Sequence, residues 1–456
     1  MTVLKAVRGT RDLLPPETEL WNHVESTARR VFARYNFGEI RTPIFEDTSL
    51  FARGVGEETD IVSKEMYTWE DRARAQSEKS QSLTLRPENT AGVVRAYIEH
   101  NLGESGLLQK LYYIGPQFRR ERPQKGRYRQ FWQIGAEVIG PPSAGSESPL
   151  RDAEVIEMLA SFLDELGITG WTLVLNSVGS STDRPRYIAA LREALAPVKD
   201  RMSPDNQRRA ETNPLRVLDS KDPADEAIIA TLPKIADYLD DASKAHFAQV
   251  LAPLDACGVK YEINPRLVRG LDYYTRTTFE FTHGELGAQN ALLGGGRYDG
   301  LSEMLGGPKA PGIGFAMGLD RLILAVQPQM EQSYRGQVRS ASSPPVRLLH
   351  AYLAPMSPEF APSALELARR LRRRNLRIEL GDPSLKARRH FEFADKLGAQ
   401  YMLFVGENEV SAGTYAAKRL GSRSKRVNVY YDFEKLVRAI KRIPRPSLKH
   451  QIAEAR

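Results

Sequence analysis

The spacing of apolar residues in the first part of the chain switches repeatedly between helix and strand. One apolar stripe at helical spacing follows Pro15 and Pro16 and predicts an amphipathic helix over Glu17–Tyr35. The next segment, residues 38–45, is predicted to be a strand that Pro43 ends or bends. The same reasoning predicts strands at Gln81–Leu85, Lys110–Ile114 and Gln130–Ile139, and a helix at Asp152–Leu166.

The middle of the chain changes character twice. After a predicted strand at Trp171–Asn176, residues 180–260 are rich in charge and helical in pattern, which indicates an inserted helical module. Strand character returns at Leu267–Phe281, and Gly312–Val326 is predicted to be a glycine-rich strand that enters a helix. Residues 1–326 are therefore predicted to form one domain that carries the insertion.

The remaining residues predict a separate, smaller domain. Residues 327–345 are polar and contain two adjacent prolines, which indicates a linker. Beyond it, strands and helices alternate, and this order predicts an α/β domain with a mostly parallel sheet over residues 346–445. The predicted strands are 347–354, 376–380 and 401–405, and the predicted helices are 361–375 and 385–397. Residues 446–456 are predicted to be a basic tail.

Charge is spread unevenly along the 456 residues. The chain carries 65 lysines and arginines against 57 acidic residues, a net charge of +8, and the basic residues cluster in its last quarter. The clusters are 369–377, 386–389, 418–426 and 441–449. Such an arrangement fits a polyanionic partner, or equally a set of solvated helix faces.

The cellular location is predicted from three features. The N-terminus lacks the apolar core of a signal peptide, and no apolar run is long enough to span a bilayer. The single cysteine, Cys257, excludes a disulfide framework within the chain, as is typical of a reducing compartment. We therefore expect a cytoplasmic protein.

Several common chemistries lack their sequence signatures. The chain has no GxxxxGK[ST] phosphate loop, and Gly312–Gly318 does not match the GxGxxG pattern of dinucleotide folds. It also has no HExxH and no paired CxxC. We therefore expect no metal ion that is held directly by protein side chains.

The densest group of candidate functional residues lies at Tyr112–Gly140. Arginines crowd a predicted loop between two apolar strands, and the planar fork of arginine is well suited to phosphate. On the second strand, Phe131, Gln133, Gly135 and Glu137 share one face, because side chains alternate along a strand. An amide and an acid on this face indicate the floor of a binding site. The alternative is an exposed hairpin with solvated charges.

Two other segments are unusual. Residues 267–281, LVRGLDYYTRTTFEF, place polar hydrogen-bonding groups inside a strand-like segment, although an ordinary amphipathic strand with a turn at Gly270 is an alternative. Residues 293–300, LGGGRYDG, contain three consecutive glycines that permit close approach of the backbone to a ligand, or simply a tight turn.

Taken together, these segments resemble the histidyl-tRNA synthetases over nearly the whole chain. The first helix and the strand at Pro43 resemble motif 1 of the class II synthetases, residues 118–137 resemble motif 2, and Gly312–Arg321 resembles motif 3. The segments at 267–281 and 293–301 resemble two blocks that are peculiar to the histidine enzymes. The resemblance implies an α+β catalytic domain on an antiparallel sheet with a helical insertion, and a C-terminal α/β anticodon-binding domain.

The resemblance also implies roles for residues on the ATP side. Arg119 would bind the α-phosphate, Arg321 the γ-phosphate, and Arg269 would stand near the α-phosphate, where other class II enzymes place a metal ion. These three arginines are the expected catalytic residues. The remaining ATP contacts are expected from Glu121, which would read the adenine amine, from Phe131, which would stack on adenine, and from Arg127.

The resemblance assigns histidine to a second group of residues. Thr84, Glu88 and Gln133 would hold its α-ammonium group. The imidazole pocket and its surroundings are expected at Glu137, Tyr273, Tyr274, Tyr298 and Arg269. The loop that would meet the tRNA acceptor end carries Arg122, Gln124 and Arg127.

The activity implied is that of a histidine–tRNA ligase, with ATP, Mg²⁺, L-histidine and tRNA(His) as partners, acting as a homodimer. One alternative is the synthetase-like regulatory subunit of ATP phosphoribosyltransferase, which lacks the charging activity. Another is a plain RNA-binding module. Three positions depart from the family pattern: Asp320 replaces the usual glutamate of motif 3, Asn89 a common glycine and Trp132 a frequent histidine.

Overall fold

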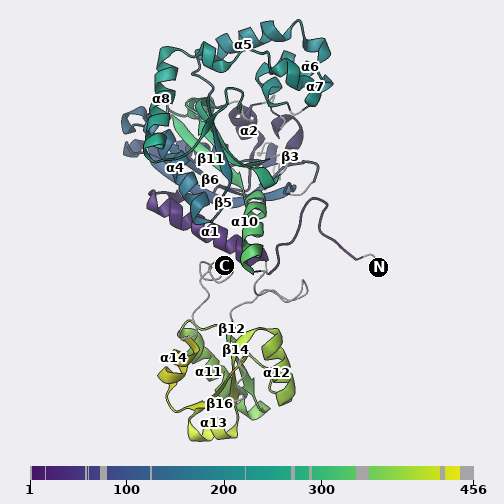
Figure 1. The fold of residues 1–456 in the computed structure, drawn as a ribbon, viewed down its shortest axis with the longest axis vertical. Helices are drawn as coiled ribbons and strands as arrows, with labels where there is room; N and C mark the ends of the chain where they lie inside the picture. Colours follow the sequence, from purple (N-terminus) through teal and green to yellow (C-terminus); the bar gives the residue numbers. More distant parts are fainter. Residues whose placement is uncertain are drawn as a thin grey trace. The chain divides into compact units, whose positions relative to one another are not determined.

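The computed structural model divides the chain into two compact units, Met1–Gln329 and Met330–Arg456 (Figure 1). It describes residues 3–15, 17–56, 59, 61–71, 80–123, 126–220, 222–268, 273–286, 290–334, 349–421 and 427–441, without the side chains at 219, 285 and 327–334. Each unit has its own sheet and its own hydrophobic core.

An eight-stranded sheet forms the centre of the first unit, in the order β1-β5-β6-β11-β10-β9-β7-β8. The inner strands pair antiparallel, whereas β1 and β8 pair parallel at the two edges. In that order the strands are β1 (Gly38–Glu39), β5 (Gln109–Phe118), β6 (Gln130–Ile139), β11 (Gly312–Gly318), β10 (Ala291–Arg297), β9 (Thr275–His283), β7 (Trp171–Ser177) and β8 (Glu262–Ile263).

Two long helices cover one face of this sheet, α1 (Glu17–Arg34) and α4 (Pro149–Glu165) (Figure 1). The Phe32 ring of α1 lies 6.0 Å from the Phe162 ring of α4 and 6.0 Å from the Phe315 ring of β11. This packing buries the apolar stripe of the first helix, so the predicted amphipathic helix is confirmed. A third helix, α10 (Leu319–Tyr334), follows directly from β11, as predicted.

The opposite face of the sheet meets α3 (Thr90–Glu99), with α2 (Thr48–Val55) and α9 (Leu301–Met304) packed beside it. A small antiparallel sheet adjoins them, made of β2 (Phe45–Asp47), β4 (Gln81–Leu85) and β3 (Tyr67–Asp71). The segment predicted as one strand over 38–45 is therefore divided between two sheets. Pro43 lies in the gap, because proline has no N–H for the ladder.

Residues 180–260, predicted to be helical, carry four α-helices and their own apolar core. These are α5 (Asp183–Leu195), α6 (Pro204–Thr212), α7 (Pro223–Ile229) and α8 (Asp241–Ala256). Tyr187, Leu191, Val217 and Ile235 are among the buried residues that hold this helical module together. None of the helices that the structure describes is both long and apolar enough to cross a membrane.

The second unit is built on a five-stranded sheet in the order β13-β12-β14-β15-β16. Its elements are β12 (Leu349–Pro355), α11 (Ala361–Arg373), β13 (Ile378–Leu380), α12 (Ala387–Lys396), β14 (Ala399–Val405), α13 (Glu407–Ala412), β15 (Tyr415–Arg419), β16 (Val427–Tyr430) and α14 (Phe433–Lys441). The prediction of a mostly parallel sheet is wrong. β12 pairs parallel with β13 and β14, but β15 and β16 extend the sheet antiparallel.

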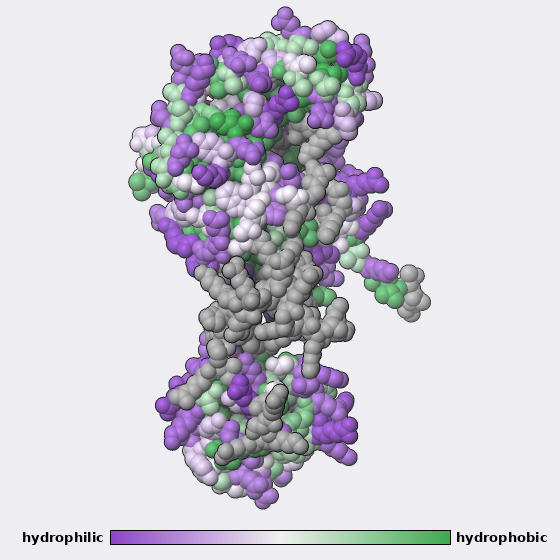
Figure 2. All heavy atoms as spheres, viewed as in Figure 1, coloured by the Kyte–Doolittle hydropathy of each residue, from purple (hydrophilic) through white to green (hydrophobic). Residues whose placement is uncertain are grey.

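The basic clusters of the second unit lie on its surface. Arg369, Arg370 and Arg373 on α11 are exposed, as are Arg388 and Arg389 on α12. Hydrophilic side chains project at both margins of this unit in Figure 2. This exposure fits both readings of the charge pattern, a polyanion-binding surface and solvated helix faces.

Candidate active site

The polar face of β6 forms the floor of a buried pocket. Glu137 is completely buried, and its two carboxylate oxygens accept hydrogen bonds from Tyr298 Oη at 2.7 Å and from Thr90 Oγ1 at 2.8 Å. Thr90 is the first residue of α3, whereas Tyr298 directly follows β10. Three segments that are distant in sequence therefore meet at one carboxylate.

Glycines on the neighbouring strands make room for this pocket. Gly314 of β11 lies beside Glu137 in the sheet register, and a Cβ at Gly314 would overlap with the Glu137 carboxylate. A Cβ at Gly312 would in turn overlap with the Tyr298 ring, and one at Gly296 would lie 2.8 Å from the Tyr274 ring. The glycine-rich segments thus lie beneath the carboxylate and tyrosine side chains, which is neither of the two uses considered from sequence.

Burial dominates the electrostatics of the two acids in the pocket. Burial raises the pKa of Glu137 to about 8, although Tyr298 and Thr90 donate to its carboxylate, and the nearby charge of Glu88 adds to the rise. The pKa of Glu88 is also raised by burial, against the opposing effects of Arg119 and of the backbone N–H groups of Thr90 and Ala91. The site therefore holds two carboxyl groups that bind protons more strongly than usual.

Four tyrosines surround these acids. The rings of Tyr273 and Tyr274 are 4.8 Å apart, and those of Tyr273 and Tyr298 are 5.8 Å apart. Tyr113 of β5 belongs to the same group, since burial and the charges of Glu137 and Glu88 raise its pKa well above the usual value. The sequence analysis missed Tyr113. The available signal was the antiparallel pairing of β5 with β6, which sets Tyr113 opposite Gly135 on the same face.

Gln133 lies on this face too and is buried, and its Oε1 has no hydrogen-bond partner among the described residues. Thr84 is placed differently. Its hydroxyl forms hydrogen bonds with Thr48 at 2.8 Å and Thr68 at 2.9 Å within the small sheet. A role for Thr84 at the α-ammonium group stays a prediction.

A second group of residues gathers around Glu121. Arg127 Nη1 lies 3.2 Å and Arg119 Nη1 lies 3.8 Å from the Glu121 carboxylate. The Arg119 guanidinium lies 5.2 Å from the centre of the Phe131 ring, and its Nε donates to the Pro87 carbonyl at 2.9 Å. This anchor fixes the guanidinium beside the ring that is expected to stack on adenine.

Arg321 joins the same group. The pKa of Arg321 is lowered, first by burial and then by repulsion from Arg127, while Glu280 and Glu121 act in the opposite direction. The side-chain carbons of Arg321 lie under Gly126 of the motif 2 loop, 3.5 Å from where a Cβ would stand. Guanidinium groups from β11–α10 and from the β5–β6 segment therefore converge, as expected for a polyphosphate site.

Two predicted site residues, Arg269 and Gln124, lie outside the described residues. Arg122 is described and exposed. Asp320 has a definite role, because its carboxylate accepts from Arg11 Nη2 at 3.0 Å and from the Trp132 N–H at 3.3 Å. The aspartate at this motif 3 position thus joins the N-terminal segment to β6.

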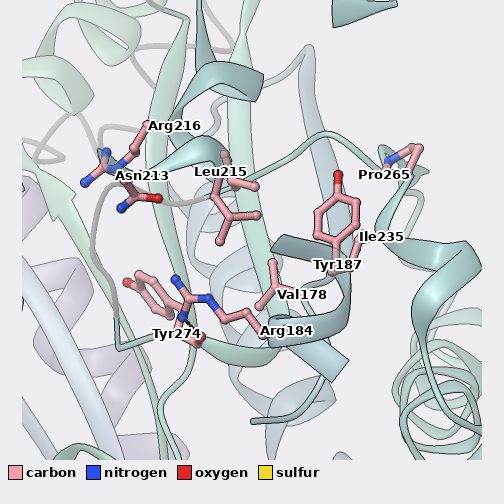
Figure 3. Close-up of a pocket in the computed structure, with 10 residues that line it drawn as sticks. Val178, Arg184, Tyr187, Asn213, Leu215, Arg216, Ile235, Pro265 and Tyr274 are labelled. Atoms are coloured by element: carbon pink, nitrogen blue, oxygen red, sulfur yellow. Dashed lines mark hydrogen bonds between the residues drawn. The ribbon is translucent and has the colours of Figure 1, made fainter. Parts of the chain in front are cut away.

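A pocket lies where the helical module meets the core (Figure 3). Its lining includes Tyr187 and Leu215 of the module, and Val178 and Tyr274 of the core. Arg184 of α5 donates to the Tyr274 carbonyl at 3.3 Å, and the two residues lie together in Figure 3. The module therefore contacts the backbone of a residue that lines the buried site.

Sequence comparison identifies the family. The family model for histidyl-tRNA synthetase matches residues 9–322, and the model for an anticodon binding domain matches residues 350–443. The chain belongs to the histidyl-tRNA synthetase family. The histidine–tRNA ligase of Koribacter versatilis (strain Ellin345) is 69% identical over 92% of both chains. The one from Solibacter usitatus (strain Ellin6076) is 54% identical over 92% of this chain and 95% of its own.

Structural comparison agrees with the family assignment. The crystal structure of apo S. aureus histidyl-tRNA synthetase matches 96% of this chain and all of its own, with a TM-score of 0.74 and 35% identity. The predicted fold class is confirmed: a catalytic domain on an antiparallel sheet, followed by an anticodon-binding domain with its own sheet.

Proposed function

We propose that this histidyl-tRNA synthetase family member activates histidine with ATP and then esterifies it to tRNA(His). The observation that carries the proposal is the buried Glu137–Tyr298 pair beside a cluster that contains Arg119, Arg127 and Arg321. In the first step the histidine carboxylate attacks the α-phosphorus, and pyrophosphate leaves. In the second step a ribose hydroxyl at the 3′ end of tRNA attacks the carbonyl carbon, and AMP leaves.

The arginines stabilise the first step. Negative charge builds on phosphate oxygens in the transition state, and fixed guanidinium groups stabilise it without reorganisation. Arg119 serves the α-phosphate and Arg321 the γ-phosphate, while Glu121, Arg127 and Phe131 hold the base and the rest of ATP. Arg269 completes the set near the α-phosphate.

The buried acids and tyrosines select histidine. Glu137 accepts from an imidazole N–H, and Tyr273, Tyr274 and Tyr298 line the ring's surroundings. Glu88, Gln133 and Thr84 receive the α-ammonium group. Such a pocket rejects amino acids that cannot form the imidazole hydrogen bonds, because the buried polar groups would be left unpaired.

Mg²⁺ accompanies ATP in this proposal. Among the described residues, no group of three or more histidine, cysteine, aspartate or glutamate side chains could hold a metal ion. One carboxylate together with phosphate oxygens is a usual arrangement for Mg²⁺, and Glu280, which acts on Arg321, is the candidate. The ion would neutralise charge on the leaving pyrophosphate.

Transfer to tRNA involves the other parts of the chain. Residues 346–445 read the anticodon, residues 180–260 brace the acceptor stem, and Arg122, Gln124 and Arg127 meet the acceptor end. Residues 327–345 link the two domains, and residues 446–456 form a basic tail. The matched anticodon binding domain and the exposed arginines of α11 and α12 support this assignment.

We further propose a cytoplasmic homodimer. The Phe45 and Trp69 rings of the small sheet lie 6.1 Å apart, and both are exposed, by 54% and 40%, with exposed Ile44 beside them. A second copy would cover this apolar patch. Sedimentation analysis tests this, since Phe45→Asp should shift the protein towards monomer, whereas a monomeric wild-type chain would contradict the proposal.

The regulatory-subunit alternative predicts a chain without phosphate-binding arginines or an anticodon domain. Arg119 and Arg321 are both present here, and so is the anticodon binding domain. The decisive experiment is ATP–pyrophosphate exchange with each of the twenty amino acids. Exchange stimulated by histidine alone supports the proposal, and a folded protein that shows no exchange with any amino acid overturns it.

A further inference from the structure

A buried ion pair lies behind the imidazole pocket. Arg297 and Asp152 are both completely buried, and Arg297 Nε lies 3.1 Å and 3.2 Å from the two carboxylate oxygens of Asp152. Arg297 Nη2 also donates to Asp152. The remaining Arg297 donors bind the Ser146 carbonyl at 2.9 Å and Asp299 at 3.0 Å, so the guanidinium is held on all sides.

Such a pair is costly to bury. Two charges lose their hydration, and an apolar pair of similar volume is often at least as stable. Burial lowers the pKa of Arg297, but Asp152 and Asp299 raise it more, so that the net pKa is raised and the side chain stays charged. Stability alone is therefore a weak reason for this pair, and its position suggests a role in the site.

The pair fixes the segment that carries Tyr298. Arg297 is the last residue of β10, and Tyr298 follows it directly and donates to Glu137. On the other side of Tyr298, Asp299 accepts from Arg297, and its N–H donates to Thr275 Oγ1 at 3.2 Å. Tyr298 is thus clamped between two residues that are tied to Asp152 and to the start of β9.

The helical module reaches the same pair. His246 of α8 is buried, and its Nε2 lies 3.8 Å from Asp152 Oδ2. Helix α8 packs against α4, which carries Asp152. The ion pair therefore lies between the module and the pocket.

We propose that Asp152 and Arg297 are positioning residues for histidine selection, which hold Tyr298 in the geometry that serves Glu137. This inference rests on the proposed ligase function. Neither residue touches the substrate. Disturbing the pair lets Tyr298 move away from Glu137, so histidine binds more weakly while the ATP side, which is built on β5, β6 and α10, keeps its geometry.

The test is a steady-state comparison of Asp152→Asn with wild type in pyrophosphate exchange. We expect the KM for histidine to rise roughly tenfold to hundredfold, the scale of a lost charge-assisted hydrogen bond, and the KM for ATP to change less than about twofold. The matched control is Glu154→Gln on the same helix, which removes an ion pair with Lys110 (2.8 Å) but has no link to Tyr298. It should leave both KM values unchanged.

A double-mutant cycle with Tyr298→Phe makes the test specific. If Asp152 acts through Tyr298, the double variant should bind histidine no more weakly than Tyr298→Phe alone. Additive losses, equal changes in both KM values, or an unchanged histidine KM in a folded Asp152→Asn would overturn the inference while leaving the ligase proposal intact. Arg297→Lys, which keeps the charge but loses the fork, should repeat the histidine effect. If neither variant folds, the pair is purely structural and the inference is wrong.

Discussion

The hydroxyl of Tyr298 donates a 2.7 Å hydrogen bond to the carboxylate of Glu137 inside a pocket where both side chains are buried. A buried carboxylate needs such donors, because water cannot solvate its charge. Even with Tyr298 and Thr90 donating, the pKa of Glu137 stays raised to about 8. The free pocket is therefore under electrostatic strain that an additional hydrogen-bond donor, such as an imidazole N–H, would relieve.

This strain predicts a pH-dependent difference in stability between wild type and Glu137→Gln. The pKa of Glu137 is about 8 in the folded chain and about 4.5 in the unfolded chain. The protonated state is therefore the favoured one on folding, and its contribution is complete below pH 4.5 and is lost as pH rises towards 8. Glutamine does not titrate. The variant should gain on wild type with rising pH, by up to about 5 kcal/mol in free energy of unfolding above pH 8.

Urea unfolding at pH 5 and pH 8.5 measures this difference. Glu303→Gln, on the surface, controls for the loss of one negative charge. A Glu137→Gln curve that runs parallel to wild type across this pH range would contradict the assigned cause. The same variant should lose most histidine-dependent exchange, because the imidazole N–H no longer meets a carboxylate.

Gly314→Ala should weaken histidine binding specifically. The new methyl group would overlap with the Glu137 carboxylate and push it out of place. We expect the KM for histidine to rise by about tenfold or more, with a destabilisation of roughly 1–3 kcal/mol from overpacking. Gly38→Ala is the matched control, since nothing lies within 4 Å of its new methyl group. Thermal melting and exchange kinetics on both variants decide the matter, and equal effects at the two positions would refute the argument.

Arg119→Lys should reduce the rate of histidine activation. Lysine carries the charge but lacks the second donor of the guanidinium fork, and it cannot keep the anchor to the Pro87 carbonyl. We expect kcat for exchange to fall on the order of 10²–10³-fold, as for loss of one preorganised transition-state donor. Arg34→Lys, in an exposed pair with Glu165, should leave the rate unchanged. A fall below tenfold would argue against a transition-state role for Arg119.

Much of the fold and both sides of the site follow from the sequence pattern. The alternation on Gln130–Ile139 placed Gln133 and Glu137 on one face, and the structure buries both there. Helix and strand spacing also predicted α1, β4 and β6 closely. These elements bury one regular face each, and periodicity records that burial directly.

Other features depend on contacts that no local pattern records. Gly312 and Gly314 are needed because side chains from other segments lie over them, which is a long-range fact. Tyr113 belongs to the site only through its pairing with Gly135. Strand character predicted over Leu267–Phe281 holds from Thr275 onward in the described residues, since Tyr273 and Tyr274 instead pack around the pocket. The short strands β15 and β16 were missed because their exposed residues give little periodic signal.

Removing residues 346–456 should separate the two steps of the reaction. The first unit holds Glu137, Arg119 and Arg321, and the second unit has its own hydrophobic core, so each is expected to keep its structure without the other. Histidine-dependent exchange should stay within about threefold of wild type, because adenylate formation needs only the first unit. Charging of tRNA(His) should fall on the order of 10²–10³-fold, as several phosphate contacts are lost. Exchange and charging assays on the same preparation, with circular dichroism as the check of folding, test this. A folded truncated protein that loses exchange and charging equally would show that the two units do not divide the work.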